Sequence, residues 1–428
     1  MKKNDPSLPN LSRRKFLKKS SLASLVGLTS TADLRAAAAR RPEGPLRADP
    51  VNCALIGYGL WGREIADAFS RLPEANLMAI CDDYDVMLRR AKRSTPEVET
   101  YADYRQVLDN PNVQAVFIAT PTHLHRQIAV DALEAGKHVY CEAPMAATIE
   151  DARAIALAAR ARPDQIFQVG QLFRSNPQHR SVFQFVRSGA IGLPVMARAQ
   201  WHAKESWRRT SPSREREMAQ NWRLDADVST GLMGEACLQQ LDVAFWILQT
   251  RPKAVTGFGQ VMLWKDGRQV PDTIQAVFEF DNGVNMLFDA TLASSFDDAY
   301  DLYFGSDSTV IFREKGKSWM FKEVDAPMLG WEVYARKDTF YRETGIALVA
   351  NATKLDAIGQ DPAADDPNVE SPLWYALKEF TDNFDFGPYL PNANYETGFQ
   401  AAVSVIKANE AILQNKRIVF EDAWFDLG

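Results

Sequence analysis

The spacing of hydrophobic positions divides the chain into regions of different kinds. From residue 51, short and nearly continuous apolar runs alternate with stretches in which apolar residues recur at helical spacing. Strands that are buried on both faces produce such runs, so the pattern predicts strand–helix–strand units on a parallel sheet. We expect strands in "VNCALIG", "NLMAICD", "VQAVFIAT" and "KHVYCE", and helices in "REIADAFSRL", "DVMLRRAKR", "HLHRQIAVDALEAG" and "TIEDARAIALAARAR". Residues 51–170 therefore predict a doubly wound α/β domain.

After residue 170 the pattern changes to one of long alternating runs. "DTIQAVFEFDNGVNMLFDATL" alternates with period two around "DNG", which is a strong signal for a turn between two strands. We expect a further strand in "PVMARAQWHAK" and helices in "HRSVFQFVRSGAIG" and "GLMGEACLQQLDVAFWILQ". Residues 340–370 predict an irregular connection, followed by helices at 373–384 and 395–414. Residues 171–428 thus predict an α+β domain with a large open, mainly antiparallel sheet.

The N-terminal stretch has the composition of an export signal. Basic residues precede a mildly apolar stretch and then small residues, and Ser12–Lys18 resembles a twin-arginine signature. A surface helix with a chance arginine pair is the alternative. We expect a signal peptide at 1–39, a linker at 40–50, and export to the periplasm or beyond by the twin-arginine machinery. No run of about 20 apolar residues follows, so we expect no stable membrane insertion after cleavage.

Charge and cysteine content narrow the possible partners. The chain has 49 Lys and Arg against 55 Asp and Glu, a formal charge of −6, and no dominant basic stripe. We therefore expect no nucleic-acid partner. The four cysteines are far apart, which predicts neither a disulfide framework nor a metal site.

The first strand is followed by a glycine-rich turn that opens a helix. The six residues are Gly57, Tyr58, Gly59, Leu60, Trp61 and Gly62. Such a turn brings backbone N–H groups to a diphosphate, so this G-x-G-x-x-G predicts a dinucleotide site in a Rossmann domain. Asp82 ends the second strand, where its carboxylate can accept hydrogen bonds from the ribose hydroxyls. With Asp83 it would repel a 2′-phosphate, which favours NAD over NADP unless Asp82 only caps the strand.

Several motifs together resemble one family. They are "GYGLWG", "ATPTHLH" at 119–125, "CEAP" at 141–144, "SGAIGLPV" at 188–195 and "GLMGEACLQQLD" at 231–242. The chain resembles the glucose–fructose oxidoreductase, inositol dehydrogenase and MocA (Gfo/Idh/MocA) family. The resemblance implies hydride exchange with a sugar or polyol, a substrate pocket and subunit contacts on the second sheet, and hence a homo-oligomer. Some members are exported with a tightly held dinucleotide, which fits the signal peptide.

The resemblance also implies roles for individual residues. The nicotinamide side of the site would be lined by Thr120, Pro121, His123 and His125. Glu142 and Ala143 would lie in the turn after the fourth strand, with Glu142 near the nicotinamide ribose. Alternatively, His125 only starts a helix and bonds to backbone groups.

Two departures from the family pattern concern proton transfer. Ala143 stands where relatives keep a lysine, and Gln239 stands where they keep a histidine. Glu235, Gln239 and Asp242 follow helical spacing and share one face. A methyl group transfers no proton, so another group acts, the reaction has changed, or the site only binds.

The candidate replacements and substrate contacts come from the second domain. Glu235, His202 and Lys204 are the candidate proton carriers, with Tyr140 a weaker choice, although His202 and Lys204 could instead face solvent or another subunit. The Arg- and Trp-rich segment 204–223 predicts a substrate lid, or alternatively a solvated loop or a subunit contact. We expect substrate contacts from Arg174, Trp222, Arg223, Gln239 and Asp242.

Three functions follow from these residues. The first is an exported NAD-binding oxidoreductase acting on a sugar, sugar acid, polyol or glycoside. The second is glycoside cleavage assisted by a transient redox step, and the third is a non-catalytic protein that binds dinucleotide and sugar.

Overall fold

The computed structural model describes residues 49–313, 317–333, 335–340, 343–349, 369–386 and 390–428. The expected signal peptide at 1–39 lies outside the described residues, as does nearly all of the linker. The four cysteines are all described; each is buried and unbridged.

The first domain has a six-stranded parallel sheet in the order β3-β2-β1-β4-β5-β6. Its strands are β1 (Val51–Ile56), β2 (Ala75–Cys81), β3 (Glu99–Tyr101), β4 (Ala115–Ile118), β5 (His138–Cys141) and β6 (Phe167–Val169). The Rossmann fold is thereby confirmed. The sequence analysis missed β3 and the following helix α5 (Tyr104–Asp109), because segments of three and six residues are too short to establish a period.

Helices cover both faces of this sheet. Besides α5 they are α3 (Leu60–Phe69), α4 (Asp85–Ser94), α6 (His125–Glu134) and α7 (Ile149–Arg160). Along β1, Ala54 and Ile56 pack with α6 and α7, while Cys53 and Leu55 pack with α3. The second face is completed by α13 (Pro372–Phe386), a helix from far along the chain whose Phe380 is fully buried there.

The second sheet has ten described strands in the order β14-β15-β13-β12-β11-β7-β10-β9-β8-β16. They are β7 (Pro194–His202), β8 (Pro252–Gln260), β9 (Thr273–Phe280), β10 (Asn285–Thr291), β11 (Ala299–Gly305), β12 (Ser308–Arg313), β13 (Ser318–Lys322), β14 (Lys337–Phe340), β15 (Glu343–Ala347) and β16 (Arg417–Val419). Only the β7–β10 pair is parallel among these strands, so the expected mainly antiparallel sheet is confirmed. The "DNG" turn joins β9 to β10, with Gly283 at φ +85°.

The expectation of an irregular connection at 340–370 was wrong in part. Residues 343–347 form β15, which pairs with β13 and β14. This segment is a strand because it pairs with neighbouring strands, although its own sequence shows no clear periodicity. Residues 350–368 lie outside the described part of the chain.

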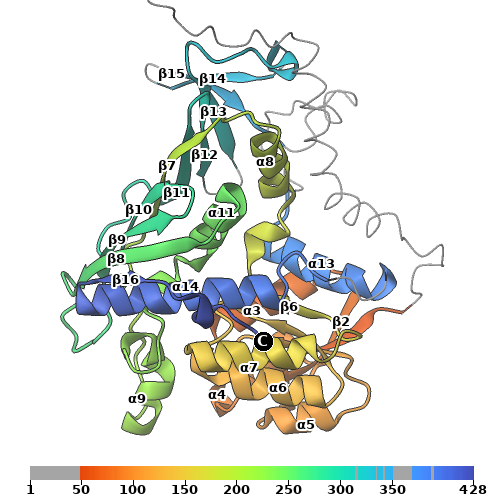
Figure 1. Ribbon diagram of the computed structural model, residues 1–428. Helices are drawn as coiled ribbons and strands as arrows, with labels where there is room; N and C mark the ends of the chain where they lie inside the picture. Colours follow the sequence, from red (N-terminus) through yellow and green to blue (C-terminus); the bar gives the residue numbers. More distant parts are fainter. Residues whose placement is uncertain (1–48, 314–316, 334, 341–342, 350–368, 387–389) are drawn as a thin grey trace, which may run out of the picture. The chain divides into compact units, whose positions relative to one another are not determined.

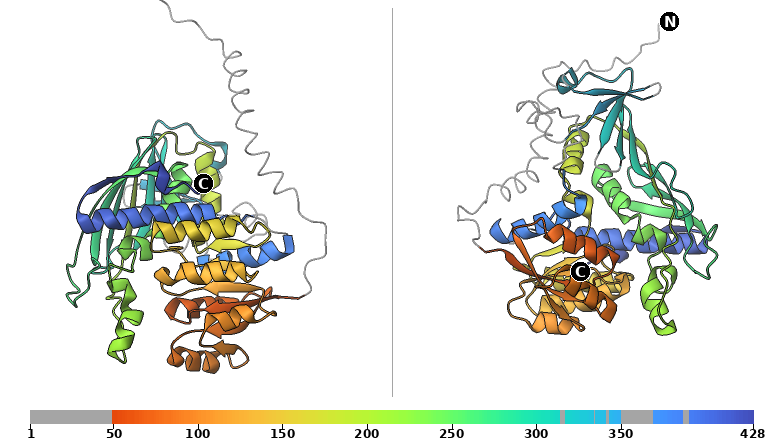
Figure 2. Two further views of the ribbon diagram at one scale, coloured as in Figure 1. Left: turned by 60° about the horizontal axis from the view of Figure 1, so that its bottom comes forward. Right: turned by 180° about the vertical axis from the view of Figure 1, so that it is seen from behind.

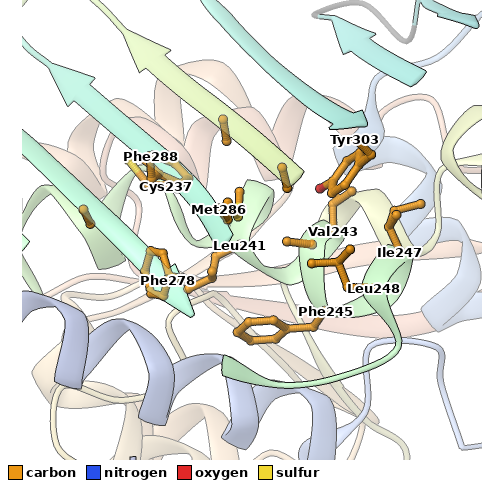
Figure 3. Packing of buried hydrophobic residues seen from close by; sticks show 14 of the residues in the cluster. Cys237, Leu241, Val243, Phe245, Ile247, Leu248, Phe278, Met286, Phe288 and Tyr303 are labelled. Atoms are coloured by element: carbon orange, nitrogen blue, oxygen red, sulfur yellow. The ribbon is translucent and has the colours of Figure 1, made fainter. Parts of the chain in front are cut away.

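One face of the second sheet packs against the helices α10 (Gly231–Glu235) and α11 (Leu238–Leu248). The sequence predicted a single helix there, whereas the chain leaves helical geometry between Glu235 and Leu238. Figure 3 shows Leu241 among Phe278, Met286 and Phe288 of the sheet. This core holds α11 against the strands.

Helix α14 (Tyr395–Gln414) has the predicted bounds and joins the two cores. Asn394 caps it by accepting hydrogen bonds from the N–H groups of Glu396 and Thr397. Val405 and Ile412 pack into the core of the second sheet, while Phe399 packs with α7 of the first domain. Figures 1 and 2 show this helix, in blue, beside both α7 and the strands of the second sheet. No helix in the described part of the chain has the length and apolarity to cross a membrane.

Candidate active site

The glycine-rich turn has the geometry of an anion site. Gly57 has φ +97°, and a Cβ there would lie 2.6 Å from the carbonyl oxygen of Ala119. A Cβ at Gly62 would lie 2.0 Å from the carbonyl oxygen of Gly57, so both positions require glycine. A Cβ at Gly59 would meet nothing within 4 Å, and no side chain caps α3. The first N–H groups of α3 are therefore open to a diphosphate, with exposed Leu60 and Trp61 beside them.

Asp82 ties this turn to the next loop. Its two carboxylate oxygens accept hydrogen bonds of 2.8 Å each from the backbone N–H groups of Tyr58 and Tyr84. Each oxygen keeps a further lone pair for a ribose hydroxyl. Burial is the main cause that raises the Asp82 pKa, opposed by these two hydrogen bonds.

The turn after β4 is held together by His125. Its ring nitrogens lie 2.9 Å from the carbonyl oxygen of Thr120 and 3.0 Å from that of Pro144, and the residue is 1% exposed. Burial lowers its pKa to about 4. This placement is that of the alternative reading, in which His125 starts a helix and bonds to backbone groups.

His123 lies in the same turn, two residues after Pro121, and is only partly buried. Its Nδ1 is buried without a hydrogen-bond partner, and burial lowers its pKa. The ring packs edge-on against Trp222 of the second domain, with centroids 5.9 Å apart. His123 thus has a ring nitrogen without a hydrogen-bond partner in the described structure, next to Trp222.

Glu142 is a buried acid beside Ala143. It is 8% exposed, and its Oε1 has no hydrogen-bond partner in the described structure. Burial raises its pKa to about 7, although interactions with Trp61, the Ala143 amide and Tyr140 act in the opposite direction. A carboxyl group with such a pKa can accept or donate a proton near neutral pH.

Glu235 links the two domains through its carboxylate. Oε2 accepts a 3.2 Å hydrogen bond from Thr122 Oγ1, and Oε1 accepts 2.7 Å and 3.2 Å bonds from the hydroxyl and N–H of Thr230. Burial raises its pKa, while Arg223, whose Nε lies 3.7 Å away, lowers it. Arg223 also lies over the ring of Trp222, 4.6 Å from its centroid. These contacts bring Glu235, Trp222 and Arg223 together next to the turn of Thr120 to His125.

Gln239 and Asp242 form hydrogen bonds with residues that directly follow β6. Gln239 donates a 2.7 Å hydrogen bond to the carbonyl of Gly170 and accepts one of 3.0 Å from the N–H of Leu172. Asp242 is 1% exposed and accepts two bonds, 2.7 and 2.8 Å, from the guanidinium of Arg174. Arg174 and Asp242 are thus bonded to each other and Gln239 to the backbone, while the expected contacts of these three residues with a substrate stay a prediction.

His202 and Lys204 lie away from this cluster. His202 Nε2 is 2.7 Å from Asp289 Oδ2, while the neighbouring Ala199 and Ala290 point to the opposite face and pack in the core with α11. Lys204 donates to the carbonyl of Ala293. The alternation of β7 turns His202 to the face of the sheet opposite α11. That His202 or Lys204 replaces the missing lysine stays a prediction.

The sequence analysis did not identify the roles of two residues at the site, Thr122 and Glu142. Thr122 was read only as part of a motif, and its bond to Glu235 depends on the approach of two distant segments. Glu142 was expected near a ribose, but its raised pKa follows from burial without a cation. The signal for it was Ala143, because the missing lysine is also a missing positive charge.

Comparison with known protein families gives two consecutive matches. Residues 51–171 match the family described as "Oxidoreductase family, NAD-binding Rossmann fold", and residues 179–317 match the "GFO/IDH/MocA C-terminal domain". Together they cover more than half of the chain. The chain belongs to the Gfo/Idh/MocA oxidoreductase family. Its N-terminal domain is an NAD-binding Rossmann domain, and the open glycine turn and Asp82 fit that cofactor.

Relatives of this Gfo/Idh/MocA protein have several activities. Levoglucosan dehydrogenase of Pseudarthrobacter phenanthrenivorans is 28% identical over 207 residues, 46% of this chain and 51% of that protein. A glycosyl hydrolase family 109 protein of Shewanella baltica is 28% identical over 231 residues, 46% of this chain and 50% of that protein. In both cases the match spans about half of the relative's length.

Solved structures share the fold of this family member. A levoglucosan dehydrogenase in complex with NADH and L-sorbose has a TM-score of 0.70 at 21% identity, covering 87% of this chain and 99% of that one. At this identity the likeness concerns the fold.

Proposed function

We propose that this protein is an exported NAD-dependent oxidoreductase of sugars, sugar acids, polyols or glycosides in which Glu142 takes the place of the missing lysine as proton acceptor. The observation that carries the proposal is the buried, unpartnered Glu142 Oε1 next to Ala143. Bound NAD would supply the hydride acceptor, and a levoglucosan dehydrogenase structure of the same fold contains NADH.

The residues of the chain bind the cofactor, accept the proton and contact the sugar. The N–H groups that begin α3 bind the diphosphate, and Asp82 accepts hydrogen bonds from the ribose. Glu142 takes the proton of the substrate hydroxyl as the hydride leaves the adjoining carbon, so that alcohol becomes carbonyl. His123, Trp222 and Arg223 form the side of the site that contacts the sugar, and Glu235 orients that side through Thr122.

Redox-assisted glycoside cleavage is a second candidate function. The similarity to the glycosyl hydrolase family 109 protein favours it. Hydrolysis of a glycoside involves no net redox change, so bound NAD would not be consumed and the released aglycone would be the product to detect. A carboxyl group able both to accept and to return a proton near neutral pH suits this sequence as well.

The experiment that tests the proposal measures reduction of the cofactor and release of the aglycone in the same incubation. Purified protein is denatured to release bound dinucleotide, then native protein is incubated with sugars and glycosides while NADH absorbance and aglycone release are recorded. A change in absorbance supports the dehydrogenase, and aglycone release without it supports redox-assisted cleavage. Sugar binding with neither signal, or a protein that binds no dinucleotide, refutes the proposal.

Export rests on the sequence of residues 1–39 and is a further part of the proposal. Replacing Arg13 and Arg14 by Lys should retain the protein in the cytoplasm of its host. Immunoblots of cell fractions test this, and an unchanged distribution would reject export by the twin-arginine machinery.

Self-association is supported by the outward face of the second sheet. Met196 and Leu287 lie there with 39% and 45% exposure, on neighbouring strands β7 and β10. We infer a homo-oligomer that covers this face. Sedimentation of the wild type and of Leu287→Asp tests it, and a monomeric wild type would refute it.

A further inference from the structure

Helix α9 (Arg214–Asn221) carries an arginine that reaches the first domain. Arg216 makes two contacts with the Asp83 carboxylate, 3.1 and 3.3 Å long, and its guanidinium carbon lies 4.5 Å from the ring centroid of Tyr84. Asp83 and Tyr84 connect β2 to α4, whereas α9 belongs to the connection between β7 and α10. Figures 1 and 2 show α9, in light green, extending away from the second sheet on the side of α4.

The contact lies beside the position expected for the adenosine ribose. Asp82, which offers its lone pairs to the ribose, precedes Asp83 directly and also accepts a bond from the N–H of Tyr84. Arg216 is close enough to Asp82 for each to shift the other's pKa. Its Nε is buried and has no hydrogen-bond partner in the described structure. The Nε–H group of Arg216 therefore has no acceptor among the described residues at the edge of the expected cofactor site.

The residues that flank α9 on the side of the second domain are fixed by hydrogen bonds and ion pairs. Asn221 accepts a 2.7 Å hydrogen bond from the N–H of Arg209 and donates one of 2.9 Å to its carbonyl. Arg208 is bonded to Asp266 and Glu217. These fixed residues lie on the second domain, so opening of the Arg216 contact would let the start of α9 move away from Asp83.

We propose that α9 is a strap across the adenosine end of the dinucleotide and that Arg216 is the latch that keeps it closed. The proposal rests on the NAD site described above and adds a residue that governs how long the cofactor stays. Breaking one partly exposed ion pair and one cation–π contact gives a modest effect, which we expect to be an about three- to tenfold faster release.

The test measures release rather than turnover. Protein loaded with NADH is mixed with excess NAD, and the fluorescence of bound NADH is followed in wild type, Arg216→Ala and Arg214→Ala. Arg214 is the matched control, because it lies on the exposed side of the same helix two residues earlier. Alanine favours helix, so neither variant should lose α9. Release should be faster in Arg216→Ala, unchanged in Arg214→Ala, and intermediate in Arg216→Lys, which keeps the charge but not the planar fork.

Hydrogen–deuterium exchange provides a second readout. Bound NADH should slow exchange in residues 214–221 of the wild type, and the slowing should be lost in Arg216→Ala. Equal release rates in all variants would overturn the latch while leaving the NAD site intact. A wild type that binds no NADH would overturn the site and the latch together.

Discussion

Glu142 and Gly170 lie so close that a methyl group on Gly170 would be 2.4 Å from Glu142 Oε2. The two residues follow the neighbouring strands β5 and β6, so the end of one strand provides the space for the carboxyl group at the end of the other. This relationship places an acid beside Ala143 and removes it from water.

Gly170→Ala should destabilise the protein by about 1–3 kcal/mol, because the added methyl group overlaps Glu142 and the Ala143 amide. Urea unfolding measures the change. In a Glu142→Ala background the same substitution should cost clearly less, since the carboxyl group is gone. Strictly additive costs would mean that the two residues are not in contact.

Glu142→Gln should change how stability depends on pH. The pKa of Glu142 rises from 4.5 to about 7 on folding, so the folded state favours the protonated acid. Its contribution is fully present below pH 4.5 and is lost as pH rises through about 7, a loss on the order of 3 kcal/mol. Urea unfolding at pH 5 and pH 8 should show this loss in the wild type, but not in Glu142→Gln.

The control for this variant is the exposed Glu134→Gln at the end of α6, which should keep the wild-type dependence. If Glu142→Gln also keeps it, the acid is ionised in the folded protein at both pH values.

Ala143→Lys should raise turnover with a sugar or polyol by about 10²-fold or more, since a positioned amine restores the usual proton acceptor. The added cation should also lower the Glu142 pKa, so the pH–rate profile should shift toward acid. Steady-state rates across pH measure both effects. Unchanged rates and profile would mean that an amine at this position does not reach the reacting hydroxyl.

Asp82→Ala should weaken NADH binding about tenfold or more, because it removes the ribose acceptor and leaves the N–H groups of Tyr58 and Tyr84 without their partner. Binding of NADPH should fall less, since a negative charge near the 2′-phosphate is lost. Fluorescence titrations with both cofactors measure the ratio. Asp85→Ala, at an exposed carboxylate at the start of α4, is the control and should leave both affinities unchanged.

Local patterns were sufficient for most of the first domain and for β7, β9 and β10 of the second sheet. The strands β1, β2, β4 and β5 and the helix α14 were predicted because each carries enough residues of one period to identify itself. The glycine turn was recognisable because its three glycines lie within six consecutive residues, and two of them, Gly57 and Gly62, leave no room for a Cβ.

The chemistry of the site was decided by segments that meet only in the folded chain. Nothing local shows that Thr122 bonds to Glu235, that Gln239 is committed to Gly170 and Leu172, or that His202 faces outward. A pKa also depends on what surrounds a group in three dimensions, so Glu142 could be located from its motif but not recognised as an acid near neutrality. The sequence by itself determined the longer periodic elements and the cofactor turn, because these depend on neighbours along the chain. Only the tertiary structure decided which polar groups are free to act, because burial and hydrogen bonding depend on neighbours in space.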